Sequence, residues 1–468
     1  MENFEQAKCT AVPKVGVAPQ VENTPQEGRR ARFAKDVGIT LGAKFCNYGV
    51  ALISSIMLAR MLGPDGRGLL AVVSLLPGLV VAFGNLGIDA SAVYLVAQKK
   101  WPLKILSGNI LSLTLLLSLI CVACGFGTVA LFSHALFPGV SARYLFLSLA
   151  LVPLGLLLSN VSSIFNGLAR YRELNIFAVL QTVAFPVLFG ALTWFGRLGL
   201  GGAILALILS VALANVAAIS RLWRILGTPT LALSLGCLND ILRYGVVSHI
   251  GSVVQFLNYR VDVLLLNGFL NPKAVGFYTL AVSLAEILWS LSYAAGTVLF
   301  PLIASPIDSA QRNAATRTVA RFVFLATSLG ALLLFFLGRI AIVTLYSNRF
   351  LPAIHPLQAI LPGVVALSAA RVLANDLAGR GKVKVNSAIA FVTMMANVSL
   401  NFVLIPRFGI VGAAWSSTIT YCLTMIATVA LYCKYSGEAW SRLFLPERED
   451  LATYAVAFAH IRKLLART

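Results

Sequence analysis

The chain has 468 residues, of which 59% are hydrophobic and only 12% are charged, and its formal net charge is +20 at pH 7. A soluble globular domain has about 25% charged residues, so a soluble fold of this length could not cover its surface and is excluded. The basic residues stand a few at a time between apolar runs, as in the loops of a membrane protein, which argues against a nucleic-acid-binding protein.

The apolar runs are close to the length of about 20 residues that a helix needs to cross the hydrocarbon core of a membrane. They lack the alternation of a transmembrane β-barrel. The sequence therefore predicts an all-α, polytopic membrane protein with about twelve transmembrane helices. The first six predicted spans are 37–58, 68–88, 105–132, 144–168, 174–195 and 198–220, and the second six are 244–266, 275–303, 322–346, 356–377, 385–405 and 408–433.

Both ends of the chain are more polar than the spans. Residues 1–36 contain three prolines and a basic cluster, so we expect a disordered cytoplasmic tail. Residues 434–468 form a second tail on the same side or at the membrane interface. Within it, the short stretch 451–465 is typical of a helix that lies on the membrane surface.

The distribution of Lys and Arg predicts the orientation in the membrane. The tails and the loops after even-numbered spans hold 26 of the 37 basic residues, the loops after odd-numbered spans hold 7, and four lie within spans. Because cytoplasmic loops are enriched in Lys and Arg, both termini are predicted to be cytoplasmic. Pro64, Lys273 and Arg407 are then expected on the outer face.

Short motifs occur twice at a nearly constant separation. LGPDGRG at 62–68 corresponds to LNPKAVG at 270–276, and RLGLGGA at 197–203 corresponds to RFGIVGA at 407–413. Each half has an even number of spans, so the two halves insert the same way up, as parallel repeats around a central cavity. The predicted parts are an N-terminal six-helix lobe at 37–221, a cytoplasmic linker at 222–243 and a C-terminal six-helix lobe at 244–433.

Ionisable residues within the spans are candidate functional residues, because a charge in hydrocarbon is costly unless it faces a cavity or a partner. The first span has a polar stripe at helical spacing that contains Lys44 and Asn47, and the seventh has a broad polar face with Arg260 and Asp262. Deep cations suit an anionic ligand, and the arginine fork is well shaped for phosphate. The candidates in the later spans are Glu286, Arg371 and Asp376, whereas Arg339 lies close enough to a span end for its charge to reach the interface.

Internal ion pairs are the alternative interpretation of these charges. Arg260 would then pair with Glu286, and Arg371 with Asp376. His249, on the polar face of the seventh span, is interpreted as a helix-contact residue in preference to a proton carrier.

No pattern in the sequence is typical of an enzyme. The chain has no GxxxxGK[ST] phosphate-binding loop, no zinc motif and no nucleophile–base pair, so neither catalysis nor a cofactor is predicted. Cys121 and Cys124 form an isolated CxxC in an apolar run, and small core residues explain this pair better than a metal or redox site.

Several segments resemble the bacterial polysaccharide flippases of the multidrug/oligosaccharidyl-lipid/polysaccharide exporter superfamily. ARMLGPDGRGLLA at 59–71 is similar to the end of their first helix, and YRVDVLLLNGFLNPKAVGFYTLA at 259–281 is similar to their seventh helix and its hairpin. Residues 361–386 and 401–421 resemble their C-terminal signature. In this order, the segments extend the resemblance over nearly all of 37–433.

The resemblance implies a transporter with two six-helix lobes and a cationic cavity that opens alternately to each face. Its substrate would be a polyprenyl-diphosphate-linked oligosaccharide, flipped outward across the bacterial inner membrane for surface polysaccharide (exopolysaccharide) biosynthesis. A gradient of H⁺ or Na⁺ would drive transport, with other polysaccharide-assembly proteins as partners. The substrate-binding candidates are Lys44, Asn47, Arg260 and Arg371, and the cation-coupling candidates are Asp262, which matches an aspartate of the family's seventh helix, and Glu286.

Two other functions fit the composition. One is a cation-coupled multidrug exporter of the same superfamily, whose cationic substrates the cavity arginine and lysine would repel. The other is a scaffold of a polysaccharide-synthesis complex without transport activity, which would leave the deep cations unexplained. The flippase is therefore the favoured hypothesis.

Overall fold

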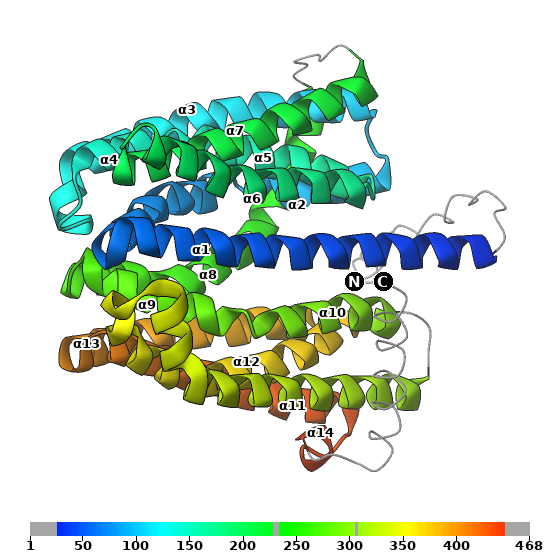
Figure 1. Cartoon of the computed structure of the whole chain (residues 1–468). Helices are drawn as coiled ribbons and strands as arrows, with labels where there is room; N and C mark the ends of the chain where they lie inside the picture. Colours follow the sequence, from blue (N-terminus) through cyan, green and yellow to red (C-terminus); the bar gives the residue numbers. More distant parts are fainter. Residues whose placement is uncertain (1–25, 228–233, 305–307, 445–468) are drawn as a thin grey trace, which may run out of the picture.

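The computed structural model describes residues 26–227, 234–304 and 308–444, and all the regular secondary structure in them is helical (Figure 1). The helices of the first half are α1 (Gln26–Gly84), α2 (Ile88–Gln98), α3 (Leu103–Leu136), α4 (Ala142–Ser148), α5 (Leu151–Gly167), α6 (Tyr171–Trp194) and α7 (Gly199–Leu226). Those of the second half are α8 (Leu235–Phe269), α9 (Pro272–Glu286), α10 (Trp289–Ala304), α11 (Ser309–Ala341), η1 (Ile342–Tyr346), η2 (Asn348–Ala353), α12 (Ile354–Gly379), α13 (Val383–Ser436) and α14 (Ser441–Phe444). The predicted all-α class is confirmed.

Helix α1 turns back on itself at Gly63, whose φ of 67° and ψ of −174° interrupt the helical backbone. The Arg67 Nη1 donates a hydrogen bond to the Ser55 carbonyl at 3.0 Å, although the two residues are 12 apart in the sequence. In a continuous helix, that separation would be about 18 Å. The helix is therefore a hairpin of two antiparallel limbs, and these limbs are the first two predicted spans.

Helix α13 turns back in the same way at Gly409, where φ is 59°. The side chains of Asn397 and Thr420 are hydrogen bonded across its two limbs at 3.2 Å. In the part of the chain that the structure describes, eight helices are long and apolar enough to cross a membrane, and the bent pair α9–α10 makes a ninth. Because α1 and α13 each cross twice and α8 is 35 residues long, the described chain makes about twelve crossings, as predicted.

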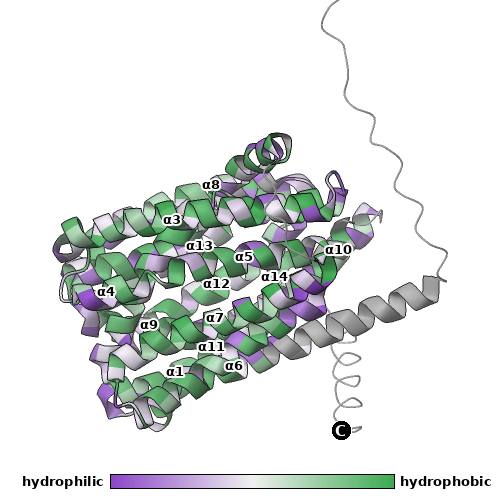
Figure 2. Cartoon of the chain, turned by 90° about the horizontal axis from the view of Figure 1, so that it is seen from above, coloured by the Kyte–Doolittle hydropathy of each residue, from purple (hydrophilic) through white to green (hydrophobic). Residues whose placement is uncertain are grey.

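Apolar residues predominate along the lengths of the helices, and hydrophilic residues gather toward the two ends of the bundle (Figure 2). We call the end with the turns at Gly63 and Gly409 the hairpin end, which is on the left in Figure 1. The opposite end, with Lys100, Arg170 and Arg380, is the basic end. Lys273 pairs with Asp65 at 3.8 Å, so the α8–α9 turn also lies at the hairpin end.

The helices of the two halves lie on opposite sides of α1, α8 and α9, which run between them (Figure 1). Helix α8 contacts both halves. At the basic end, the Ser91 Oγ donates to the Ile241 carbonyl at 2.6 Å, and the rings of Tyr94 and Tyr244 stack with centroids 4.1 Å apart. Nearer the hairpin end, the side chain of Val263 is buried in a core shared with α9 and α12.

The two halves meet backbone to backbone at the hairpin end. A Cβ added to Gly68 would lie 1.6 Å from the Pro272 carbonyl oxygen, and a Cβ added to Gly276 would lie 2.1 Å from the Pro64 carbonyl oxygen. Only residues without a Cβ allow α1 and α9 to approach so closely. This contact closes the hairpin end of the bundle.

Arginine contacts reinforce the closure. The Arg60 Nη2 and Nε donate to the carbonyls of Thr344 and Leu345 at 2.5 and 2.8 Å, so a cation of the first half lies against the end of η1. Carbonyl groups at a helix C-terminus carry partial negative charge, which favours this arrangement.

The structure differs from two predicted boundaries. Helix α1 begins at Gln26, directly after Pro25, so residues 26–36 of the predicted tail are helical, while 1–25 and the predicted surface helix 451–465 lie outside the described residues. The predicted linker 222–243 is helical at both ends, because α7 reaches Leu226 and α8 starts at Leu235. Its apolar residues Leu222, Cys237 and Ile241 share one buried core, which explains the extended helices.

Candidate functional site

A cavity of about 420 Å³ lies between the two halves, within the usual size range of ligand sites. We call it the central cavity. It is lined by both limbs of α1 and by α6, α7, α8 and α9, and its polar lining residues are Arg67, Ser74, Arg260, Thr279 and Ser283. A side pocket of about 330 Å³ extends between α1 and α6, shares Arg67 and Ser283 with it, and adds the polar residues Ser54, Ser55, Gln181, Thr182 and Ser210.

Arg67 lines both spaces and is only 8% exposed. Its Nη1 donates to the Ser55 carbonyl at 3.0 Å and to the Ser55 Oγ at 2.9 Å, and its Nη2 donates to the Ser283 Oγ at 3.4 Å. Among the described residues, its Nε has no acceptor and Arg67 takes part in no ion pair. The cavity wall therefore contains a buried cation that is held only by neutral groups.

The predicted spans 37–58 and 68–88 place Arg67 in an outer loop, and this prediction is wrong. The α1 hairpin turns at Gly63, so Arg67 already lies one turn inside the returning limb. The repeat could have revealed the unusual position of Arg67. In the second half, the equivalent position is Val275, which is fully buried in the core, so the first half has an arginine where its counterpart has an apolar residue.

The polar face of α8 supplies the second cation of the central cavity. Arg260 lines the cavity, is exposed, and takes part in none of the ion pairs between described residues. The alternative pair with Glu286 is therefore not formed, although the two charges interact electrostatically. The His249 Nε2 is 3.1 Å from the Phe83 carbonyl, a helix contact as interpreted from the sequence.

Arg371 is enclosed by aromatic side chains of α8 and α10. Its guanidinium carbon is 4.1 Å from the ring centroid of Trp289 and 4.6 Å from that of Tyr293. Its Nη2 donates to the Tyr259 hydroxyl at 2.8 Å. This environment combines cation–π attraction with one hydrogen bond to a neutral acceptor.

Asp376 does not pair with Arg371, so that alternative is wrong. Its carboxylate accepts hydrogen bonds from Arg380 and, at 2.6 Å, from the Thr316 hydroxyl. Residues four apart share a helix face, whereas residues five apart point in different directions, which explains why Arg380 is the partner.

Asp262 is buried inside the second half and has no cationic partner among the described ion pairs. It accepts a short hydrogen bond from the Tyr278 hydroxyl and a second one, at 2.8 Å, from the Val263 backbone N–H. The Tyr278 hydroxyl also lies 3.3 Å from the Ser417 Oγ. Asp262, on α8, is thus connected through Tyr278 to α13.

The helix face of α1 with Lys44 and Asn47 continues at helical spacing through Ala51 and Ser55, which line the side pocket. Lys44 and Asn47 are half-buried and continue the stripe toward the basic end, beyond the residues that line the two spaces. The Asn47 Oδ1 is buried without a hydrogen-bond partner in the described part of the chain.

In the described ranges, no group of three or more His, Cys, Asp or Glu side chains is placed so that it could hold a metal ion. Cys121 is buried in the core, as interpreted from the sequence. Cys124 is exposed, so only the first residue of the CxxC is a core residue.

Comparison with known proteins assigns the family. The sequence profile of the family described as "Polysaccharide biosynthesis protein" matches residues 33–306. The chain belongs to this family. The predicted resemblance to the polysaccharide flippase family is therefore confirmed. The matched region contains Arg67, Arg260 and both limbs of α1, whereas Arg371 lies outside it.

Among sequence relatives, the Haloferax volcanii protein named "Probable low-salt glycan biosynthesis flippase Agl15" is 22% identical over 85% of this chain and 84% of its own length. The uncharacterized membrane protein MJ1068 of Methanocaldococcus jannaschii is 25% identical over an alignment of 194 residues. This alignment covers 40% of this chain and 38% of the length of that relative.

Solved structures show the same fold. The lipid II flippase MurJ in an inward closed conformation aligns with a TM-score of 0.73 at 15% identity, over 84% of this chain and 87% of that one. An inward-facing multidrug resistance MATE family transporter of the MOP superfamily aligns with a TM-score of 0.65 at 16% identity, over 84% and 94% of the two chains.

Proposed function

We propose that this protein is a flippase that moves a polyprenyl-diphosphate-linked oligosaccharide outward across the cytoplasmic membrane. The family assignment, the flippase name of the Haloferax relative and the fold shared with MurJ support this proposal. The protein acts as a transporter and forms no covalent bond with its cargo.

One observation carries the proposal: Arg67 is a buried cation without an acidic partner among the described residues, in a cavity that also contains Arg260. Burying an unpaired charge costs several kcal/mol. A diphosphate supplies at least two negative charges and many acceptor oxygens, and it satisfies two guanidinium groups at once. The hydroxyl groups of the side pocket offer hydrogen bonds to the first sugar.

Alternating access follows from the contacts that close the bundle. The proposed resting state is closed at the hairpin end, where Gly68 and Gly276 hold the halves together. Separation of these contacts would release the headgroup to the outer face, while the polyprenyl tail stays in lipid. Lys44 and Asn47, nearer the basic end, would meet the headgroup as it enters from the cytoplasm.

We assign coupling to H⁺ or Na⁺ to the acids of the second half. Asp262 has no ion-pair partner in the described chain, and Glu286 interacts electrostatically with both Arg260 and Arg371. A cation on either carboxylate changes the charge that faces the arginines. Binding of a cation and of the anionic headgroup are thereby linked.

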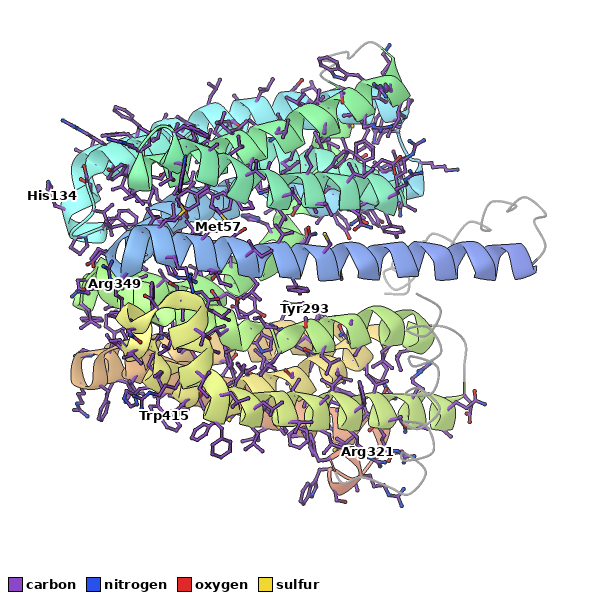
Figure 3. All side chains as sticks on the ribbon, in the orientation of Figure 1. Met57, His134, Tyr293, Arg321, Arg349 and Trp415 are labelled. Carbon is purple, nitrogen blue, oxygen red and sulfur yellow. The ribbon has the colours of Figure 1, made fainter. Side chains whose placement is uncertain are left out.

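A cation-coupled multidrug exporter has the same fold, but Arg67 and Arg260 would repel cationic drugs. A scaffold role without transport would require no unpaired buried arginine. Genetic complementation separates the three functions. In cells that lack the flippase, Arg67→Gln and Arg260→Gln should abolish polysaccharide export at normal membrane abundance, whereas Arg349→Gln, an exposed residue at the hairpin end (Figure 3), should export normally.

Full export by Arg67→Gln and Arg260→Gln would contradict the flippase proposal and favour a scaffold. Drug resistance conferred by the wild-type protein, without any effect on polysaccharide export, would favour the multidrug exporter.

A further inference from the structure

A second recognition site lies in the wall of the second half, beside Arg371. Helix α8 contributes Tyr259, α10 contributes Trp289 and Tyr293, and α12 contributes Arg371. The guanidinium carbon of Arg371 is 4.1 Å from the centre of the Trp289 ring and 4.6 Å from the centre of the Tyr293 ring. Tyr259, whose hydroxyl accepts from Nη2 at 2.8 Å, fixes the orientation of the guanidinium.

Two hydrogen-bond donors at this place have no acceptor. The Arg371 Nη1 and the Trp289 Nε1 are both buried and unpartnered among the described residues, and Trp289 is only 4% exposed. Buried donors in proteins are nearly always satisfied, so each unsatisfied one requires an explanation. Two such donors beside each other indicate a site that lacks its acceptor.

The acids inside the second half do not supply this acceptor. Asp376 is occupied by Arg380 and Thr316, and Asp262 is occupied by Tyr278 and the backbone of Val263. Glu286 is exposed at the end of α9 and forms no hydrogen bond or ion pair with another described residue. None of these three carboxylates accepts from Arg371 or Trp289 in the described part of the chain, and an acceptor on a bound ligand would satisfy both donors.

We propose that Arg371 and Trp289 bind the carboxylate of an acidic sugar in the transported oligosaccharide. One free N–H group on each residue can donate to one of the two oxygens of a carboxylate, and a guanidinium that stacks on aromatic rings still presents its edge to a planar anion. The proposal rests on the proposed function, because it places the sugars of the same substrate.

Tyr293 provides the surface for the sugar ring. Its side chain is 46% exposed, and in Figure 3 it lies between α10 and α1, where the two halves face each other. One face of its ring is covered by Arg371. The uncovered part can stack on the apolar face of a sugar, as aromatic side chains commonly do at ligand sites.

Direct binding tests this site without transport. We would titrate the purified protein in detergent with methyl glucuronide and, separately, with methyl glucoside, and follow the heat of binding and the tryptophan fluorescence. The glucuronide should bind at least tenfold more tightly than the glucoside. Arg371→Gln should remove this preference, and Arg371→Lys, which retains the charge without the fork, should retain only part of it.

Controls separate this site from the diphosphate site. Arg260→Gln should bind the glucuronide as the wild type does while losing transport, and the melting temperature of Arg371→Gln should show that the variant is folded. If Arg371→Gln does not fold, Tyr293→Ala takes its place and should weaken the binding of the glucuronide at least threefold.

Equal binding of the glucuronide and the glucoside by the wild type would overturn the proposal, as would a preference that Arg371→Gln retains. If the glucuronide binds to Glu286→Gln but not to the wild type, Glu286 is itself the acceptor for Arg371 and Trp289. This result would also refute the acidic-sugar site. Intact transport together with either result would overturn this site alone and leave the proposed flippase function standing.

Discussion

Gly68 and Gly276 occupy equivalent places in the two halves of the chain, and each packs its backbone against the turn of the other half. Gly68 meets the Pro272 carbonyl, and Gly276 meets the Pro64 carbonyl. The contact is thus reciprocal, as expected where two related repeats meet about a common axis. No side chain separates the halves at this point, so the closed state depends on two missing Cβ atoms.

Substitution of Gly68 should therefore favour the state that is open at the hairpin end. A Cβ on Gly68 would lie 1.6 Å from the Pro272 oxygen. Overpacking costs about 1–3 kcal/mol, and 1.4 kcal/mol changes an equilibrium about tenfold. In a cysteine-free background, Ser283→Cys in the central cavity should react with an impermeant maleimide from the hairpin side several times faster in Gly68→Ala than in the parent.

Gly127→Ala is the matched control, since a Cβ on Gly127 meets nothing within 4 Å. It should leave the labelling rate unchanged. Equal labelling rates in Gly68→Ala and its parent would show that the glycine contact does not hold the halves closed.

Arg380 and Arg170 are separated by 210 residues, as are the repeated motifs that begin at Arg197 and Arg407, but the two should differ in their importance for stability. The Arg380 partner Asp376 is fully buried, so Arg380→Ala leaves an uncompensated charge and should destabilise the protein by about 3 kcal/mol. Arg170 forms an exposed pair with Glu173 at 3.4 Å, so Arg170→Ala should cost less than about 1 kcal/mol. Thermal unfolding in detergent measures the stability of both variants. Similar losses of stability would contradict the claim that the burial of Asp376 makes Arg380 the more important of the two.

Hydropathy predicted the crossings well, because the membrane sets the length of every span. Side-chain partners across helices were predicted less well. Spacing along one helix would have identified Arg380 as the partner of Asp376, since the two are four residues apart. No one-dimensional pattern brings Tyr259, Trp289 and Arg371 together from three helices. Arg67 was missed because its position depends on where α1 turns.

Asp240 should make stability depend on pH at the basic end. Its Oδ2 is 2.8 Å from the Lys100 Nζ and accepts from the Trp101 Nε1 at 2.9 Å. These hydrogen bonds, first that from Lys100, hold the pKa of Asp240 below its ordinary value. The stabilisation is therefore present above the ordinary aspartate pKa of about 4, and it is lost as the pH falls through the lower pKa of the folded state.

The melting temperature of Asp240→Asn should accordingly lie below that of the wild type by a constant amount between pH 7 and pH 5. The difference should shrink only in more acidic solution. A difference that disappears between pH 7 and pH 5 would show that another group titrates there.

Lys273 tests the membrane orientation. It lies at the hairpin end, 3.8 Å from Asp65 and exposed, so its ion pair should contribute less than about 1 kcal/mol and Lys273→Cys should be stable. In intact cells, this cysteine should react with an impermeant maleimide, as the excess of basic residues at the opposite end predicts. A cysteine at position 273 that reacts only after the cells are broken would reverse the orientation.

The central claim is that the cavity arginines transfer a diphosphate-linked oligosaccharide between leaflets. The most direct measurement reconstitutes the purified protein in liposomes and follows a fluorescent polyprenyl-diphosphate oligosaccharide from one leaflet to the other. Wild-type protein should transfer it faster than protein-free liposomes, and Arg67→Gln should slow the transfer at least tenfold, while Arg349→Gln should match the wild type. Transfer no faster than in protein-free liposomes, or equal transfer by wild type and Arg67→Gln, would contradict the account.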